Sequence, residues 1–205
     1  MLRGTCPRSA RAPLLRCLTM RRVAPSCLLL AAALGSGCGD LDGAVELAWV
    51  IVDRDGDAIF PGGVFSLDDE RDSCELRGVV GDRSVSYDLR VELEVCDPSC
   101  EAGCDSEQCQ VLPRHEFACN EARGSLPTVP DSGGEPYLFT VRAVVSVPSL
   151  QLECREPSPS CVAVPAPRER RVEPGLVTDL QVYQIAIDVD RDSNEPLDLE
   201  ACGCA

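Results

Sequence analysis

The sequence predicts an all-β fold in which two antiparallel sheets pack as a sandwich, with disulfide-rich loops. Three observations support this prediction. Several short segments alternate apolar and polar residues, the connections between them are rich in Gly and Pro, and the 205 residues include fourteen Cys. Because alternate side chains of a strand point to opposite faces, each alternating segment offers one face to a core and one to water.

The alternation is clearest in the segments 45–53, 84–96, 137–147 and 176–189. In the second of these, apolar residues from Val85 to Val95 alternate with polar residues that include Asp88, Glu92 and Glu94. This pattern predicts a strand with one buried face and one wet face.

The last alternating segment changes phase. Leu180 and Val182 share one parity, whereas Ile185 and Ile187 share the other. A strand keeps one apolar face through such a change only if it contains an extra residue, so we expect a β-bulge near 183–184.

A Gly-containing turn leads into an aromatic-rich strand within the segment 117–145. The residues that form this pattern are Gly134, Tyr137, Phe139 and Val141. The segment resembles transthyretin-like or carboxypeptidase-regulatory-like sandwiches, and other Ig-like sandwiches share the pattern. The resemblance implies an Ig-like or transthyretin-like fold that serves as a non-catalytic binding or spacer module.

The N-terminal part has the layout of a secretory signal peptide. Residues 1–39 contain no Asp or Glu, and Arg21 and Arg22 precede an apolar run over 23–34. This run is too short to span a bilayer, and the small residues 35–37 follow it. The small residues end at Cys38, where the sequence resembles bacterial lipoproteins, and the resemblance implies that Cys38 is lipidated. The alternative is an ordinary secreted protein in which Cys38 forms a disulfide.

These features divide the chain into five parts. Residues 1–19 precede Met20, where we expect translation to start, and we expect 20–37 to form the signal peptide. A lipid-anchored N-terminus over 38–42 leads into a β-sandwich domain over 43–190. An acidic, Cys-containing tail over 191–205 completes the chain.

The expected mature part is strongly acidic. From Cys38 onward it has 13 Arg, no Lys and 34 acidic residues, a net charge of −21. This charge argues against nucleic acid as a partner, because nucleic-acid affinity depends largely on cationic contacts to phosphate. We expect the membrane, contacted through the lipid, and other envelope proteins as partners. In enteric bacteria, an Asp directly after the lipidated Cys holds lipoproteins at the inner membrane. This sequence has Gly39 at that position, so the lipoprotein resemblance implies the outer membrane of a Gram-negative bacterium.

Ten cysteines remain after the leader and Cys38 are set aside. The secretory route favours disulfides over zinc, although four of the ten lie within the segment 96–109. We therefore expect disulfides among Cys74, Cys96, Cys100, Cys104, Cys109, Cys119, Cys154, Cys161, Cys202 and Cys204.

Elimination suggests a specific pairing for some of these cysteines. Cys74 and Cys119 flank predicted core strands and should pair with each other. Cys154 and Cys161 bracket a short Pro-containing loop and should close it. The tail pair, Cys202 with Cys204, should then reach back to the 96–109 loop.

Two Asp-rich stretches suggest calcium sites, because a hard cation needs several oxygen ligands from one tight loop. Neither stretch completes a twelve-residue calcium loop, and polar turns after strands have the same composition. The candidate ligands are Asp53, Asp55 and Asp57 in the first stretch and Asp188, Asp190 and Asp192 in the second.

The sequence contains no recognisable catalytic motif. His115 is the single His, and no nucleophile elbow, phosphate-binding loop or zinc-protease motif accompanies it. We therefore expect no cofactor and a non-enzymatic role in binding, adhesion or structure. The alternatives are an envelope hydrolase that uses His115 and a calcium-dependent binding module.

Overall fold

The computed structural model describes residues 42–61, 74–189 and 196–204. Within these ranges the regular structure consists of β-strands and short 3-10 turns, so the all-β prediction is confirmed. No helix in the described ranges is long and apolar enough to cross a membrane. Cys38, Asp190 and Asp192 lie outside the described residues, and the predictions on them stay predictions.

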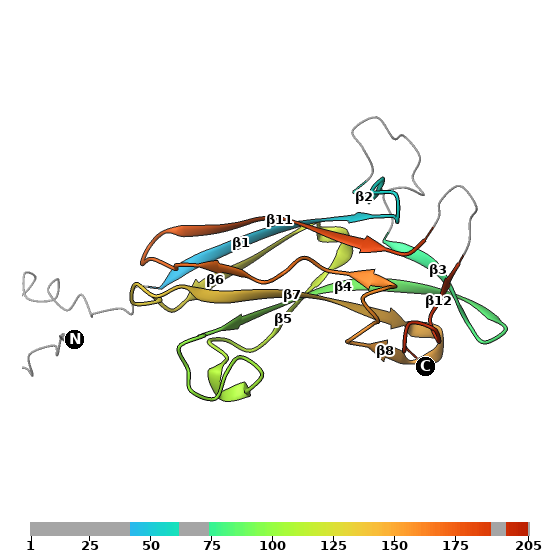
Figure 1. The fold of residues 1–205 in the computed structure, drawn as a ribbon. Helices are drawn as coiled ribbons and strands as arrows, with labels where there is room; N and C mark the ends of the chain where they lie inside the picture. The colour runs from blue at the N-terminus through green and yellow to red at the C-terminus, as the bar shows by residue number, and fades with distance from the viewer. Residues whose placement is uncertain (1–41, 62–73, 190–195, 205) are drawn as a thin grey trace, which may run out of the picture. The chain divides into compact units, whose positions relative to one another are not determined.

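Two sheets form the protein (Figure 1). In sheet A the strand order is β2-β1-β11-β9, and β6 pairs with β1 beside β2. Its strands are β1 (Gly43–Val52), β2 (Ala58–Phe60), β6 (Arg123–Val129), β9 (Val162–Ala163) and β11 (Val177–Ile187).

Sheet B is the larger of the two. Its strand order is β10-β7-β4-β3-β12, with β5 on β4 and β8 on β7. Its strands are β3 (Glu75–Val80), β4 (Arg83–Cys96), β5 (His115–Ala118), β7 (Tyr137–Val147), β8 (Leu152–Cys154), β10 (Arg168–Arg170) and β12 (Leu197–Asp198).

Both sheets are mixed, which corrects the expectation of purely antiparallel sheets. β1 pairs with β11 in parallel, and β12 pairs with β3 in parallel. Every other strand except β12 lies between β1 and β11 in the chain, so no hairpin joins these two strands. Period-two alternation reports which face of a strand is buried but not the direction of its neighbour, so the sequence pattern was silent on this point.

The core lies between the sheets and follows the predicted phase of the strands. Sheet A contributes Trp49, which is 2 % exposed and donates from Nε1 to the Cys119 carbonyl oxygen at 2.9 Å. Sheet B contributes Phe117 beside it, with ring centroids 5.8 Å apart. Other buried residues in the predicted phase are Val45, Leu47, Ile51, Tyr87, Leu89, Val91, Leu93, Val95, Phe139, Val141, Val145, Ile185 and Ile187.

The predicted bulge in β11 is present, but it lies two residues earlier than expected. The register with β1 shifts between Asp179 and Val182, and Gln181 between them has φ +65°. Val182 is therefore 55 % exposed, whereas Tyr183 is buried. The alternation predicted the bulge too late in the strand, because Val182 is apolar, which is typical of a core residue, although it lies on the outward face.

A side chain from the other sheet holds this bulge in place. Arg168 of β10 donates from its guanidinium to the carbonyl oxygens of Leu180 and Val182, the latter at 2.9 Å. The same guanidinium lies 4.0 Å from the centre of the Tyr183 ring. Arg168 thus satisfies carbonyl groups beside the bulge and links the two sheets at this edge.

All ten expected cysteines form disulfides, and the Cys74–Cys119 bridge is confirmed. Cys74 immediately precedes β3, and Cys119 begins a 3-10 turn (Cys119–Glu121) that leads into β6. The bridge therefore ties the start of sheet B to the connection that enters sheet A. Within the 96–109 loop, Cys96 pairs with Cys104 and Cys100 with Cys109.

The predicted pairing of the other four cysteines was wrong. Cys154 pairs with Cys204, and Cys161 pairs with Cys202. Cys154 belongs to β8 of sheet B, whereas Cys161 directly precedes β9 of sheet A. The C-terminal segment reaches this region, and the Ser158 amide donates to the Cys202 carbonyl oxygen at 2.9 Å. Proximity along the chain favoured a Cys154–Cys161 loop, but the arrangement of the strands gives each cysteine a tail partner.

Candidate functional site

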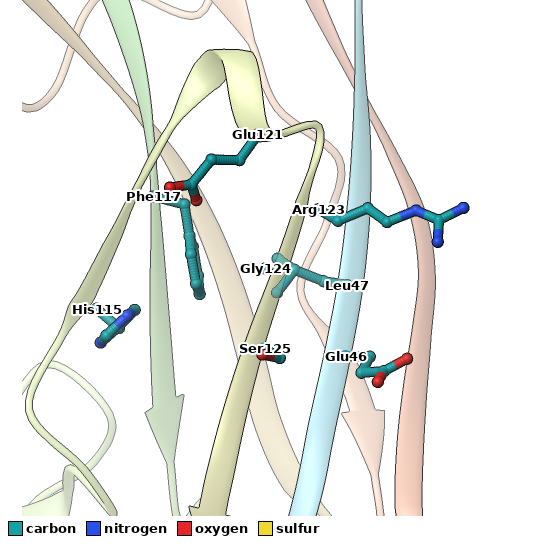
Figure 2. Close-up of a pocket in the computed structure, with 8 residues that line it drawn as sticks. All are labelled: Glu46, Leu47, His115, Phe117, Glu121, Arg123, Gly124 and Ser125. Atoms are coloured by element: carbon teal, nitrogen blue, oxygen red, sulfur yellow. The ribbon is translucent and has the colours of Figure 1, made fainter.

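An open groove lies between β5 of sheet B and β6 of sheet A, where neither strand has a further neighbour in the described part of the chain (Figure 2). Its volume is about 410 Å³, within the range of ligand sites in proteins. The residues that line it are Glu46, Leu47, His115, Phe117, Glu121, Arg123, Gly124 and Ser125.

Phe117 forms the apolar wall of the groove. Its ring lies between His115 and Gly124 in Figure 2, and the His115 ring is 4.7 Å away between centroids. A Cβ atom on Gly124 would lie 2.6 Å from Phe117 Cε1, a distance that real Cβ contacts do not show. Gly124 therefore allows the aromatic ring to pack directly against the β6 backbone.

The outer edge of β6 presents backbone groups beside the groove. The Trp49 amide donates to the Ala122 carbonyl oxygen at 3.1 Å, and Gly124 lies opposite Leu47 in the antiparallel register. In such a ladder, alternate residues direct both backbone groups to the neighbouring strand, so Gly124 faces β1. Arg123 and Ser125 must then direct theirs away from β1.

No strand in the described ranges pairs with this edge of β6. Arg123 and Ser125 thus offer two N–H donors and two carbonyl acceptors at the rim of the groove. Pro127 is next in the same phase and has no N–H, so the open edge is short. Sequence reasoning missed this edge, although Pro127 and Gly124 together were a signal that β6 is a lateral strand with a close neighbour.

The groove contains His115, the single catalytic candidate, but not a catalytic arrangement. Ser125 and the carboxylates of Glu46 and Glu121 also line it. Within the described residues, His115 has a ring contact with Phe117 and no hydrogen bond to Ser125 or to a carboxylate. A nucleophile and its base normally lie within hydrogen-bond reach, so the geometry gives the hydrolase hypothesis no positive support.

The first candidate calcium loop is a hydrogen-bonded turn. Asp53 is 4 % exposed, and its Oδ1 accepts from the backbone amides of Asp55 at 3.1 Å and Asp57 at 2.8 Å. Asp188, from the second stretch, forms an ion pair with Arg54 at 3.3 Å. Among the described residues, no three His, Cys, Asp or Glu side chains are grouped so as to hold a metal ion.

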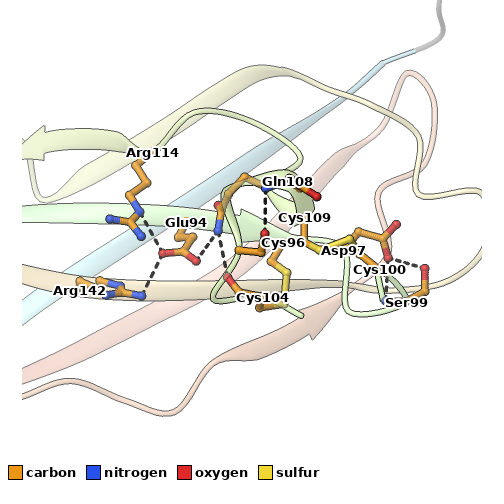
Figure 3. Close-up of a disulfide and its surroundings, with 12 residues drawn as sticks. Glu94, Cys96, Asp97, Ser99, Cys100, Cys104, Gln108, Cys109, Arg114 and Arg142 are labelled. Atoms are coloured by element: carbon orange, nitrogen blue, oxygen red, sulfur yellow. Dashed lines mark hydrogen bonds and ion pairs between the residues drawn. A yellow bond between two sulfur atoms is a disulfide. The ribbon is translucent and has the colours of Figure 1, made fainter. Parts of the chain in front are cut away.

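A cluster of charged residues covers the outward face of sheet B, and two of them are buried although the sequence predicted that they would be exposed. Glu92 and Glu94 were expected on a wet face of β4 but are 1 % and 3 % exposed. Glu94 Oε2 lies 3.2 Å from Arg114 Nε and 3.1 Å from Arg142 Nη2 (Figure 3). Gln110 donates from Nε2 to Glu94 Oε1 at 2.6 Å, so the carboxylate is enclosed by donors.

Arg155 performs the same role for the neighbouring carboxylate. Its guanidinium lies 2.6 Å from Glu92, 2.9 Å from Glu116 and 2.7 Å from Glu153. Arg90 also contacts Glu116 and Glu153, at 2.6 and 2.5 Å. We call this set the ionic layer: Arg90, Glu92, Glu94, Arg114, Glu116, Arg142, Glu153, Arg155 and Glu156. Because its charged groups form ion pairs with one another, we assign the layer a structural role.

Comparison of the chain with protein-family models, with curated proteins and with solved structures finds no match. Among the described residues, the groove and the exposed edge of β6 are the candidate ligand site.

Proposed function

We propose that this protein is a non-enzymatic binding module held on a Gram-negative cell envelope, at the outer membrane, by a lipid on Cys38. Its ligand site is the groove beside β6, and its ligand is an extended polypeptide segment that adds to the sheet as a further strand. The open edge at Arg123 and Ser125 is the observation that supports this proposal.

Strand addition uses backbone hydrogen bonds for affinity and side-chain contacts for selectivity. An incoming segment opposite β6 would meet the two outward-facing residues, Arg123 and Ser125. Its side chains would meet Phe117 and His115 on the groove wall. Pro127 would end the pairing after a few residues, so the proposed ligand motif is short.

Charge indicates the class of peptide. Glu46 and Glu121 line the groove, are exposed, and form no ion pair with another described residue. The expected mature part also has a net charge of −21. Among the described residues, Arg123 is the one Arg that lines the groove, so the two carboxylates leave this lining with a net charge of −1. A cationic segment of another envelope protein is therefore the favoured occupant.

We also propose an Ig-like or transthyretin-like type for the fold. The two-sheet core supports it, as does the turn that contains Gly133 and Gly134 and leads into β7. Tyr137, Phe139 and Val141 follow that turn and point inward, as the resemblance implied.

Two substitutions at one position test the binding site. Ser125→Pro removes the outward N–H while leaving the residues that face β1 unchanged, and Pro127 shows that this edge accepts proline. Ser125→Ala retains the N–H and serves as the matched control. The probe is a library of ten-residue peptides displayed on phage, selected on the unlipidated Cys38→Ser protein. Extended cationic peptides should be enriched, Ser125→Pro should lose them, and Ser125→Ala should retain them.

The same variants separate binding from hydrolysis. If Ser125 were a nucleophile, Ser125→Ala would abolish cleavage of generic esters and His115→Ala would do the same. We expect no such activity in the parent protein. Loss of peptide binding in both Ser125 variants, or no peptide enrichment at all, would refute strand addition at β6.

The lipid anchor has its own test. Cys38→Ser should move the protein from the detergent-extracted membrane fraction to the soluble fraction. The variant lacks the thiol that would carry the acyl chains, and stable membrane attachment depends on those chains. Unchanged membrane partitioning would contradict lipidation at Cys38.

A further inference from the structure

Two consecutive large apolar residues are exposed at one end of the sandwich. Leu176 is 56 % exposed and Val177 is 59 % exposed, at the turn that leads into β11. These two side chains therefore lie outside the core. Exposed apolar side chains that lie together can form a contact surface for another molecule or a membrane. The identity of that partner has to be argued from the surrounding structure.

The turn that presents Leu176 is well defined. The Leu176 amide donates to the Glu173 carbonyl oxygen at 3.2 Å, and Pro174 and Gly175 lie between them. Gly175 has φ +69°, so the sequence and dihedral fit a type II turn, with Pro first and Gly second in the central pair. Leu176 is thus held outward by a stiff turn and loses little freedom on contact.

The same turn is bonded to the start of the folded domain. The Gly175 amide donates to the Asp42 carbonyl oxygen at 3.0 Å, and the Ala44 amide donates to the Leu176 carbonyl oxygen at 2.9 Å. Because β1 and β11 are parallel, both strands begin at this end (Figure 1). The apolar pair therefore lies where the chain enters the sandwich.

The proposed anchor limits how far this end can be from a bilayer. Three residues lie between Cys38 and Asp42, so four Cα–Cα steps join them. A fully extended chain spans at most about 3.6 Å per residue, so the tether is at most about 14 Å long. Any lipid on Cys38 thus holds the Asp42 end, and with it Leu176 and Val177, within the reach of the headgroup region.

We propose that Leu176 and Val177 dock into the surface of a zwitterionic bilayer and orient the sandwich end-on, an inference that rests on the proposed lipid anchor. Glu173 and Asp131 are exposed near this turn, and Arg171 is a nearby exposed cation. The overall charge of −21 in the expected mature part disfavours an anionic surface, whereas apolar insertion needs no charge.

The end-on orientation has a consequence for the groove. β6 runs antiparallel to β1, so the open edge at Arg123 and Ser125 lies toward the end of β6 that is remote from Val129. Val129 is paired with Gly43, at the docked end. Docking would therefore hold the open edge away from the membrane, where a polypeptide ligand can reach it.

A tryptophan placed at either end of sheet A tests this orientation. Leu176→Trp reports on the docked end. Val164→Trp is the matched control, because Val164 is 39 % exposed and follows β9, which pairs with the far end of β11. The eleven residues of β11 separate the two ends by about 35 Å. The native Trp49 is buried and gives both variants the same background.

The lipidated protein, purified from the membrane fraction, is reconstituted into phosphatidylethanolamine–phosphatidylcholine vesicles that contain phosphatidylcholine brominated in its acyl chains. We expect the bromolipid to quench at least half of the added Leu176→Trp emission and to leave Val164→Trp emission unchanged. Leu176→Trp in the Cys38→Ser background should show no quenching.

The outcomes distinguish the two proposals. Protein that does not float with the vesicles refutes the lipid anchor and the docking that depends on it. Protein that floats with the vesicles but shows no quenching at position 176, or equal quenching at positions 176 and 164, refutes docking and leaves the anchor intact.

Discussion

The outward faces of the two sheets differ sharply, although both come from strands with the same alternating pattern. On sheet B, the face carries the ionic layer, and Glu92 and Glu94 within it are almost fully buried. On sheet A, the corresponding face of β1 and β11 is formed mainly by small or uncharged residues, such as Ala48 opposite Val182 and Val50 opposite Gln184. The outward face of sheet B thus contains buried, ion-paired carboxylates, whereas the outward face of sheet A, among the described residues, does not.

The difference shows that a carboxylate on a strand can be buried when neighbouring side chains provide positive charges and hydrogen-bond donors. Glu92 lies opposite Arg142 on β7, and Arg114 and Arg155 reach across from outside the strand. The long Arg side chains form ion pairs with both carboxylates, Arg155 also donates a hydrogen bond to Glu92, and Gln110 donates one to Glu94. Glu46 on sheet A forms no ion pair with another described residue and stays exposed.

The largest effect should come from removing a buried carboxylate of the ionic layer. Glu94→Ala would leave Arg114, Arg142 and Gln110 without their shared acceptor. Breaking a buried ion pair costs about 3–5 kcal/mol when the charge left behind is itself buried. Arg114 and Arg142 are 45 % and 28 % exposed and can be solvated, so the free energy of unfolding should fall by about 2–3 kcal/mol. Equilibrium unfolding in urea measures it. A cost below about 1 kcal/mol would mean that the layer contributes little to stability.

A smaller loss is expected when a half-exposed arginine of the layer is removed. The Arg155 side chain is 49 % exposed, and its removal would leave Glu92 with Arg114 at 3.9 Å as its remaining ion-pair partner among the described residues. Solvent screens the half-exposed Arg155 guanidinium, so Arg155→Ala should lower the free energy of unfolding by less than Glu94→Ala does. Urea unfolding at low and high salt should show that part of this loss disappears in salt.

Acid should weaken the ion pairs that Glu153 forms in the ionic layer. The hydrogen bond from Arg90 lowers the pKa of Glu153 below its ordinary value of 4.5, and the charge of Arg155 acts in the same direction. A carboxyl with a lowered folded-state pKa stabilises the fold above its unfolded pKa, and that stabilisation is lost as the pH falls through the folded pKa. Stability should therefore decrease below about pH 4.5, and less steeply in Glu153→Gln. Urea unfolding across this pH range provides the measurement, and identical slopes would exclude Glu153 as a contributor.

The smallest effect is expected on the outward face of sheet A. Glu46→Ala removes an exposed carboxylate without an ion pair in the described structure, so the free energy of unfolding should change by no more than about 0.5 kcal/mol. This variant is the matched control for Glu94→Ala, since both replace a Glu on an outward strand face. Similar losses in the two variants would remove the distinction between the faces.

The candidate site was only partly visible in the sequence. His115 was identified as the one residue to locate, and the structure places it beside a groove. The open backbone edge at Arg123 and Ser125 was not predicted, because an edge is defined by the absence of a neighbour. A single strand's pattern does not record which strands lie beside it.

The sequence by itself determined the all-β class, the inward phase of β1, β4 and β7, and the Cys74–Cys119 bridge. These follow from local periodicity and from where cysteines lie relative to strands. The tertiary structure alone decided the parallel pairing of β1 with β11, the tail partners of Cys154 and Cys161, and the burial of Glu92 and Glu94. Each of these depends on residues distant in the chain, because sheet order and side-chain coverage are set when separate segments pack together.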